Sequence, residues 1–257
     1  MKKERPIRCY HTFTDDFVES KDQDCKVPEG YEWIKTSFFE KVLSAIIYAV
    51  AVVFALFYCR LFLHLRIKNR KVVKQAIKEG AFVYANHTQP LGDVFTPALV
   101  LFPNRIYTIV SPANLSIPFI GKILPYLGAL PIPSNLHEMR KFNEAVEKRV
   151  KDGHCVIVYP EAHVWEYYTG IRPFPTTSFG YPIKYGKAAY SLTVTYQKRG
   201  NGKGRPKMVI YADGPFLPGD SVPQREKAST LRDQIFQRMT ERSKNSNAEY
   251  IRYEKAE

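Results

Sequence analysis

The feature that most restricts this chain is an uncharged apolar run from Val42 to Cys59, VLSAIIYAVAVVFALFYC. As a helix, these eighteen residues extend about 27 Å at ~1.5 Å per residue, close to the hydrocarbon thickness of a bilayer. Aromatic residues precede the run and cations follow it, as is typical of membrane helices: Tyr31, Trp33, Phe38 and Phe39 before it, and Arg60, Arg66, Lys68, Arg70, Lys71 and Lys74 after it. The run therefore predicts a membrane helix, with a fully buried core helix as the alternative.

The cations after the run predict, by the positive-inside rule, that the C-terminal body lies on the cytoplasmic face of the membrane. A single crossing and an insertion into one leaflet both fit the sequence. Beyond Arg60, apolar residues recur at helical spacing between cations, which favours an amphipathic helix lying against the body. We therefore divide the chain into a polar N-terminal segment (1–36), a membrane helix with an amphipathic extension (37–79) and an α/β domain (80–257). For residues 1–36, docking onto the body and disorder are both open.

The charge of the chain is concentrated in its body. Residues 1–40 hold 7 Lys or Arg and 9 Asp or Glu, whereas the rest carries a net charge of +15 within a total of +13. A basic body attracts nucleic acid, anionic lipid headgroups or a phosphorylated substrate. Because the chain has a membrane helix and no nucleic-acid-binding signature, we expect membrane lipids as partners and no nucleic acid.

Beyond Gly80, short strand patterns alternate with amphipathic helical patterns. We expect strands over 82–85, 106–110, 156–159, 192–198 and 207–212, and helices over 93–102, 136–151 and 224–244. The turn sequence RGNGKGRP between the last two strands predicts a hairpin. This order indicates an α/β fold with a layered mixed β-sheet flanked by helices.

The chemistry-bearing residues follow two of these strands. The first strand runs into YANHTQPLGD, which places His87 in a loop at the end of the strand and Asp93 six positions later. A carboxylate bound to an imidazole fixes its tautomer and stabilises its protonated form, which makes His87 a candidate general base for a hydroxyl. The strand in VIVYPEAH delivers Glu161 to the same edge of the sheet, if the two strands are parallel.

These blocks, in their order, resemble the glycerolipid acyltransferases typified by lysophosphatidic acid acyltransferase. NHTQPLGD resembles the family's Asn-His-x4-Asp block, and SIPFIGKILPYLGALPI resembles its Pro-x-x-Gly stretch. YPEA resembles the Phe-Pro-Glu-Gly block, RPF the Pro-Phe that follows, and DGPF the Gly-x-Pro ending. The resemblance covers about half of the chain, from Phe82 to Pro215.

The resemblance implies a membrane-bound O-acyltransferase that transfers a fatty acyl group from acyl-CoA or acyl carrier protein to a hydroxyl of a lysophospholipid or related lipid. By it, His87 is the general base, Asp93 supports His87, and Glu161 and Asn86 bind the acceptor or shape its site. It implies no cofactor beyond the acyl donor. Metal-ligand spacing such as HExxH or paired CxxC is absent from the sequence, so we also expect no metal.

The sequence departs from the family at three points. Five residues rather than four separate His87 from Asp93, and turn formers among them predict a bulge that keeps the pair in contact. Ser134 and Val164 stand where the family has phosphate-binding arginines, and neither can replace a charge-assisted Arg–phosphate contact. Either another cation among Arg140, Arg172, Lys184 and Lys187 binds the phosphate, or the acceptor is not a glycerol phosphate. The alternative function is a non-catalytic membrane lipid-binding protein on the same fold.

Overall fold

A computed structural model describes residues 5–18, 25–200 and 204–256 of the chain. Its centre is a seven-stranded sheet with the order β2-β8-β7-β3-β6-β4-β5. All neighbouring strands are parallel except β7 and β8, which form the antiparallel hairpin expected from the sequence. The strands are β2 (Arg66–Lys68), β3 (Phe82–Ala85), β4 (Ile106–Val110), β5 (Ala129–Pro131), β6 (Cys155–Val158), β7 (Ala189–Gln197) and β8 (Lys207–Phe216).

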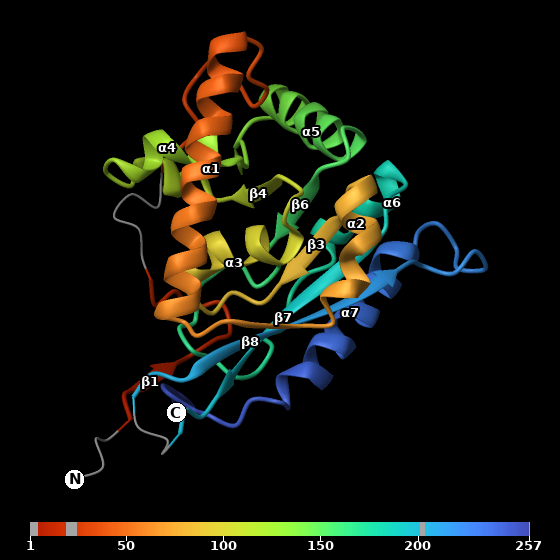
Figure 1. The fold of residues 1–257 in the computed structure, drawn as a ribbon. Coiled ribbons are helices and arrows are strands. Elements are labelled where there is room, and N and C mark those ends of the chain that lie inside the picture. The colour runs from red at the N-terminus through yellow and green to blue at the C-terminus, as the bar shows by residue number, and fades with distance from the viewer. Residues whose placement is uncertain (1–4, 19–24, 201–203, 257) are drawn as a thin grey trace.

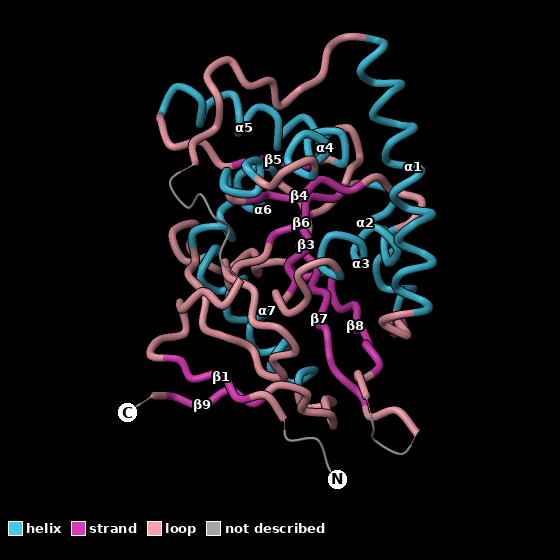
Figure 2. Tube along the Cα trace, turned by 90° about the vertical axis from the view of Figure 1, so that its left-hand side faces the viewer, coloured by secondary structure: helices cyan, strands magenta, loops and turns pink. Residues whose placement is uncertain are grey.

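Helices cover both faces of this sheet, so the predicted layered α/β fold is confirmed (Figures 1 and 2). On one face α1, α2 and α3 share a core with Val83 and Ile157. On the other, α5 and α7 share a core with Phe82 and Val156. The helices are α1 (Phe38–Leu61), α2 (Lys74–Glu79), α3 (Gly92–Leu101), α4 (Ile120–Leu127), α5 (Leu136–Lys151), α6 (Gly180–Tyr185) and α7 (Lys227–Ser243), with 3-10 turns at Arg70–Val73, Pro112–Ser116 and Thr177–Phe179.

The central strands β3 and β6 are buried along their whole length. Because successive side chains point to opposite faces, Phe82 and Tyr84 enter one core while Val83 and Ala85 enter the other. Strands buried on both faces read as continuous apolar runs. Polar residues follow each apolar run: Asn86 and His87 come after β3, and Glu161 comes after β6. These residues belong to the candidate site.

The amphipathic helix expected after Arg60 forms only in part, because its first residues form a strand and only residues 70–79 are helical. Helix α1 ends at Leu61, and β2 (Arg66–Lys68) adds to the sheet as a parallel partner of β8. The sequence Arg-Ile-Lys alternates with a period of two, and its burial alternates in the same way. Helical structure resumes only in the 3-10 turn and α2, after Asn69 has turned the chain at φ 58°. Backbone pairing with the edge of β8 prevails here over helical periodicity.

The N-terminal segment docks onto the body where the structure describes it. Strand β1 (Ile7–Tyr10) pairs in parallel with β9 (Arg252–Lys255) near the C-terminus and forms a second, two-stranded sheet. Further along, Trp33 is buried and its indole N–H donates to Pro131 O at 2.9 Å. Docking is thus the outcome for residues 5–18 and 25–36; residues 19–24 lie outside the described chain.

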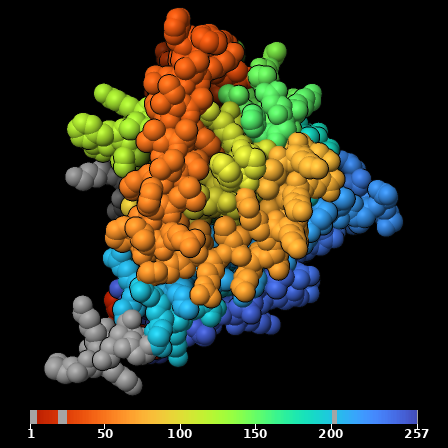
Figure 3. Space-filling view, viewed as in Figure 1, coloured from red at the N-terminus to blue at the C-terminus, as the bar shows by residue number. Residues whose placement is uncertain are grey.

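Helix α1 lies along the body rather than projecting from it (Figures 1 and 3). Its 24 residues are long and apolar enough to cross a membrane, and 17% of the apolar window is buried. The buried residues form one stripe: Ser44, Val52, Ala55 and Cys59. Spacings of three, four and eight place these residues on one face, so the remaining apolar faces of α1 are left uncovered.

Candidate active site

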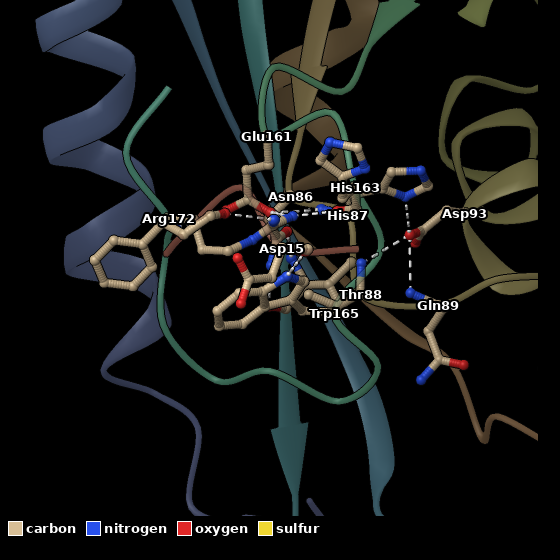
Figure 4. A network of polar contacts seen from close by, with 12 residues as sticks. Asp15, Asn86, His87, Thr88, Gln89, Asp93, Glu161, His163, Trp165 and Arg172 are labelled. Carbon is tan, nitrogen blue, oxygen red and sulfur yellow. Dashed lines mark hydrogen bonds and ion pairs between the residues drawn. The ribbon is translucent and has the colours of Figure 1, made fainter. Parts of the chain in front are cut away.

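His87 lies just beyond β3, where the central strand reaches the carboxyl edge of the sheet. Its Nδ1 is 2.7 Å from Asp93 Oδ2. The Asp93 side chain is 2% exposed, whereas that of His87 is 21% exposed. The two residues singled out by the sequence are therefore in direct contact (Figure 4). The imidazole is the member of the pair that reaches solvent.

The loop between the two residues absorbs the additional residue in a turn at Pro90 and Leu91. Helix α3 starts immediately afterwards, and Asp93 in its first turn reaches back across the loop. Its Oδ2 accepts the backbone N–H groups of Thr88 and Gln89, both at 2.8 Å. Because a carboxylate with these donors is held in place, the wider spacing does not separate it from the imidazole.

Two tyrosines hold this loop: the partly buried Tyr159 just after β6 and the buried Tyr196 on β7. The Tyr159 ring stacks on the His87 ring with centroids 4.4 Å apart, and its hydroxyl donates to Asp93 O at 2.5 Å. The Tyr196 hydroxyl on β7 donates to Thr88 Oγ1 at 2.8 Å and accepts from Gln89 Nε2 at 3.0 Å. Burial keeps the pKa of both phenols well above its usual value, so both are neutral donors.

Glu161 meets His87 across the neighbouring strand. Phe82 of β3 pairs with Val156 of β6, and the same register continued beyond both strands places Glu161 opposite His87. The His87 N–H donates to Glu161 Oε2 at 3.0 Å. The same carboxylate accepts from the Arg172 backbone N–H at 2.8 Å and from the Arg172 guanidinium at 3.2 Å. Burial raises the pKa of Glu161, and the Arg172 charge opposes that rise.

Arg172 lies inside the protein, with 0% of its side chain exposed. Besides Glu161, its guanidinium donates to the backbone oxygens of Phe13, at 3.2 Å, and of His163. It also lies 4.9 Å from the ring centroid of Trp165. All of these partners belong to the protein, so this arginine organises the loop after β6 and presents no charge to solvent.

The side chains of the other candidate binding residues bind other partners or lie away from the His87–Asp93 pair. Asn86 is buried, and its amide group donates to Val194 O at 3.1 Å and accepts the Val194 N–H at 2.7 Å. Ser134 is exposed in the turn after β5, which β4 and β6 separate from β3. The Arg140 side chain is 83% exposed on α5 and pairs with Glu144. Their proposed roles in binding stay predictions.

The two remaining cations named from the sequence also have other partners. Lys187 donates to Glu79 O at 2.6 Å, and Lys184 lies 5.1 Å from the Tyr185 ring centroid. In the described part of the chain, neither forms an ion pair with Glu161 or Asp93. A substitute for the family's phosphate-binding arginines is therefore not assembled beside His87 from these two residues.

Sequence reasoning assigned no role to Tyr159, Tyr196 or the N-terminal segment. A signal existed for Tyr159. If the strands before His87 and Glu161 are parallel and in register, Tyr159 lies opposite Ala85 and therefore close to the His87 loop. Tyr196 and Phe13 come from segments 109 and 74 positions away from His87 in this sequence. Only the strand order brings Tyr196 to the loop, and only docking of the N-terminus brings Phe13 to Arg172.

The family model Acyltransferase matches residues 64–218, which is more than half of the chain. The chain belongs to the Acyltransferase family. It is therefore an acyltransferase enzyme, and the sequence-based prediction of an acyltransferase is confirmed. The matched range of this acyltransferase begins before β2 and ends after β8, so it includes all seven strands of the main sheet.

Among solved structures, the acyltransferase is similar to the 1-acyl-sn-glycerophosphate (LPA) acyltransferase PlsC from Thermotoga maritima. The two share 17% sequence identity, and the match covers 79% of this chain and 94% of that chain with a TM-score of 0.49. No curated protein sequence matches the chain significantly.

The arrangement leaves one nitrogen of His87 free to act as a base. Among the described residues, nothing forms a hydrogen bond with His87 Nε2, whereas Nδ1 is bound to Asp93. A neutral imidazole with its Nδ1–H on a carboxylate has a free lone pair on Nε2. Within residues 5–18, 25–200 and 204–256, no three His, Cys, Asp or Glu side chains gather closely enough to hold a metal ion.

Proposed function

We propose that this acyltransferase is a membrane-bound O-acyltransferase that uses His87 as its general base. It transfers a fatty acyl group from acyl-CoA or acyl carrier protein to a hydroxyl of a lysophospholipid or related lipid acceptor. The 2.7 Å contact between His87 Nδ1 and Asp93 Oδ2 carries this proposal, because it leaves Nε2 as the basic atom of an accessible ring.

In the proposed reaction, His87 Nε2 removes the proton from the acceptor hydroxyl as the oxygen attacks the thioester carbonyl. The C–S bond then breaks, the ester forms, and the imidazolium returns its proton to the leaving thiolate. Asp93 stabilises the imidazolium and keeps its ring oriented. The acyl group, the proton and the electron pair are thereby all accounted for, and the donor thiol is the second product.

The proposed acceptor differs from a glycerol phosphate. Ser134 and Val164 stand where the family has arginines, and Arg172 is buried against Glu161. A phosphomonoester close to His87 needs bidentate cations, which these residues do not supply. We therefore propose that lysolipids with larger headgroups are better acceptors than glycerol phosphates.

The proposed attachment to the membrane uses an apolar surface centred on α1. Large apolar side chains are exposed along this helix, and others continue the surface on α4 and at the start of α3: Phe38, Phe39, Ile46, Val50, Val53, Phe57, Leu61, Phe119, Ile120, Ile123, Leu91 and Val94. Such a contiguous patch is typical of a membrane or protein interface. The length of α1 and the cations after it favour the membrane, with the body on the cytoplasmic face.

Of the two membrane geometries, insertion into one leaflet is the one we propose. The buried stripe from Ser44 to Cys59 covers most of the length of α1. A crossing helix would carry the body that covers this stripe into the hydrocarbon, where its charged residues are costly. A helix lying in the interface can keep its stripe against the protein body while its exposed apolar face enters the lipid.

The test is transfer of a labelled acyl chain by the full-length protein in vesicles, with acyl-CoA or acyl carrier protein as donor and a panel of lysolipids. We expect His87→Ala to lower kcat by about 10²- to 10⁴-fold, the range of general base catalysis. The matched control is His137→Ala, which removes an exposed histidine on α5. Equal turnover by wild type and His87→Ala would contradict the role of His87 as the base. No turnover by either protein across the panel would contradict the proposed transfer and favour a lipid-binding protein without catalysis.

A further inference from the structure

A cavity lies at the sheet edge opposite His87. Its volume is about 450 Å³, and its walls are the segment 31–36, the start of α1, the end of α5 and the first residues of β4 and β5. His87 and Glu161 follow the carboxyl ends of their strands, whereas this cavity lies at the amino ends of β4 and β5. The acyl transfer chemistry does not use it.

The cavity wall has an excess of positive charge. Five Lys or Arg residues and two carboxylates line it, for a net charge of +3. Lys148 pairs with Asp152 at 3.0 Å and Lys35 with Glu40 at 3.0 Å. In the described chain this leaves three lining cations without an ion-pair partner: Lys41, Arg105 and Arg149.

The two arginines are fixed in place although no carboxylate holds them. Arg105 donates to Ser44 Oγ and Tyr126 O, both at 2.7 Å, and Arg149 donates to Trp33 O at 3.3 Å. Both guanidinium groups lie over the Tyr107 ring, at 5.5 Å and 4.4 Å from its centroid. Their Nε atoms are both buried, with no hydrogen-bond partner among the described residues. The positive charges of Arg105 and Arg149 are thus held together at the Tyr107 ring, and the Nε–H donor of each has no partner among the described residues.

A neighbouring histidine responds to this positive field. The ring of His154 lies 5.3 Å from that of Tyr107. Burial lowers the pKa of His154, and the charges of Arg149, Arg105 and Lys148 lower it further against the opposing effect of Asp152. An anion bound among these cations would offset their effect, so His154 is an internal reporter of occupancy.

We propose that this cavity is an anion site that binds a phosphate group through Lys41, Arg105 and Arg149. Phosphate fits because it accepts several hydrogen bonds at once from Arg and Lys donors and neutralises their repulsion. The volume is within the range of pockets for small ligands. The phosphate comes from a lipid headgroup or from a soluble phosphate ester. The lipid source rests on the proposed membrane function, since Lys41 and Ser44 belong to α1.

The first experiment uses the wild-type protein and follows the pKa of His154 by NMR. Glycerol 3-phosphate is the soluble probe, and vesicles of phosphatidylcholine with phosphatidylglycerol are the lipid probe, against phosphatidylcholine alone. We expect at least one probe to raise the pKa of His154. An unchanged pKa with both probes overturns the proposal without requiring any variant to fold.

The second experiment compares two double variants that each remove two positive charges. Lys41→Gln with Arg149→Gln changes the cavity, and Lys198→Gln with Lys244→Gln changes two exposed cations, after β7 and at the end of α7, outside the cavity and outside the α1 surface. From the contribution that each of the two cations makes near an anionic surface, we expect the cavity variant to bind anionic vesicles roughly 30-fold more weakly. We expect the control to lose much less.

The outcomes separate the sources and the proposals. Weaker vesicle binding by the cavity variant alone identifies a headgroup, and loss of only the glycerol 3-phosphate response identifies a soluble ester. Equal losses in both double variants show diffuse surface attraction and overturn the site. Turnover with a short-chain acceptor in detergent is expected to be unchanged in the cavity variant and lost in His87→Ala. His87→Ala is expected to keep the phosphate response, so each proposal can fail alone.

Discussion

At the scale of single residues, the imidazole of His87 is positioned from three directions. Asp93 holds Nδ1, the Tyr159 ring lies against one face, and Glu161 accepts the backbone N–H. Each of these contacts comes from a side chain that is itself buried or bound elsewhere. The ring therefore has little freedom to leave the orientation that exposes Nε2, which is what a general base requires.

Loss of the Tyr159 hydroxyl tests this positioning. In Tyr159→Phe the ring can still stack, but the hydrogen bond to Asp93 O is lost, which removes about 1 kcal/mol of support for the loop. We expect kcat to fall about 3- to 10-fold with little change in KM. Tyr185→Phe removes a comparable bond, from the hydroxyl to Asn143 O at 3.1 Å, and should lower stability without affecting kcat. Identical kcat values for both variants would refute the role of Tyr159.

Ala162 offers a second residue-scale prediction. Its φ is 63°, in the left-handed region where a Cβ atom costs about 1–2 kcal/mol. The side chain is exposed and contributes little packing. Glycine also gives the unfolded chain more conformational entropy, which offsets part of the relieved strain. The net effect of Ala162→Gly should be to raise the free energy of unfolding by about 0.5–1 kcal/mol. Denaturant titration measures this, and a decrease would show that the turn is not strained in solution.

At the scale of elements, the N-terminal segment acts as a clasp on the loop after β6. Trp165 donates its indole N–H to Asp15 O at 2.8 Å and stacks on Tyr253 at 4.9 Å. Around it stand aromatic rings from both ends of the chain: Tyr10, Phe13, Phe17 and Tyr253. The paired strands β1 and β9 hold these two ends together. Residues remote in sequence thereby support Arg172, Glu161 and, through them, His87.

Deletion of residues 1–18 tests the clasp. Because Arg172 loses Phe13 O and Trp165 loses its cover, we expect a lower melting temperature and a severalfold fall in kcat. In a Trp33→Phe background, Trp165 fluorescence reports its own environment and should shift to longer wavelength. A truncated enzyme with wild-type kcat and unchanged emission would show that the loop is stable by itself.

At the scale of the whole molecule, the proposed membrane geometry predicts where the two ends of α1 lie. Lys41 and Arg60 are exposed near the two ends of the helix, about 28 Å apart at ~1.5 Å per residue. With α1 in the plane of one leaflet, both positions face the cytoplasm. With α1 crossing the bilayer, they face opposite sides.

Single cysteines at Lys41 and Arg60 distinguish these geometries. The four native cysteines, Cys9, Cys25, Cys59 and Cys155, are first replaced by serine or alanine. In sealed vesicles of known orientation, we expect a membrane-impermeant thiol reagent to label both positions from the cytoplasmic side. Labelling of the two positions from opposite sides would establish a crossing helix and contradict the proposed geometry.

Local sequence patterns were sufficient for most of the elements and for the contact between His87 and Asp93. The buried strands, the helix over 136–151 and the hairpin follow from apolar periodicity and turn residues, which act over a few neighbours. The contact of His87 with Asp93 was predictable for the same reason, since both residues lie in one short loop with turn formers between them. The apolar helix α1 was evident from its length alone.

Long-range contacts account for what the patterns could not provide. The Arg-Ile-Lys strand depends on a free edge of β8, and the burial of Arg172 depends on Glu161 and on the docked N-terminus. The positions of Tyr159 and Tyr196 beside the loop depend on strand order. Such contacts join residues far apart in the chain, and their free energy comes from burial and pairing that exist only once the sheet is assembled. Sequence therefore determined the proposed reacting groups, while folding determined what holds them and which charges remain exposed.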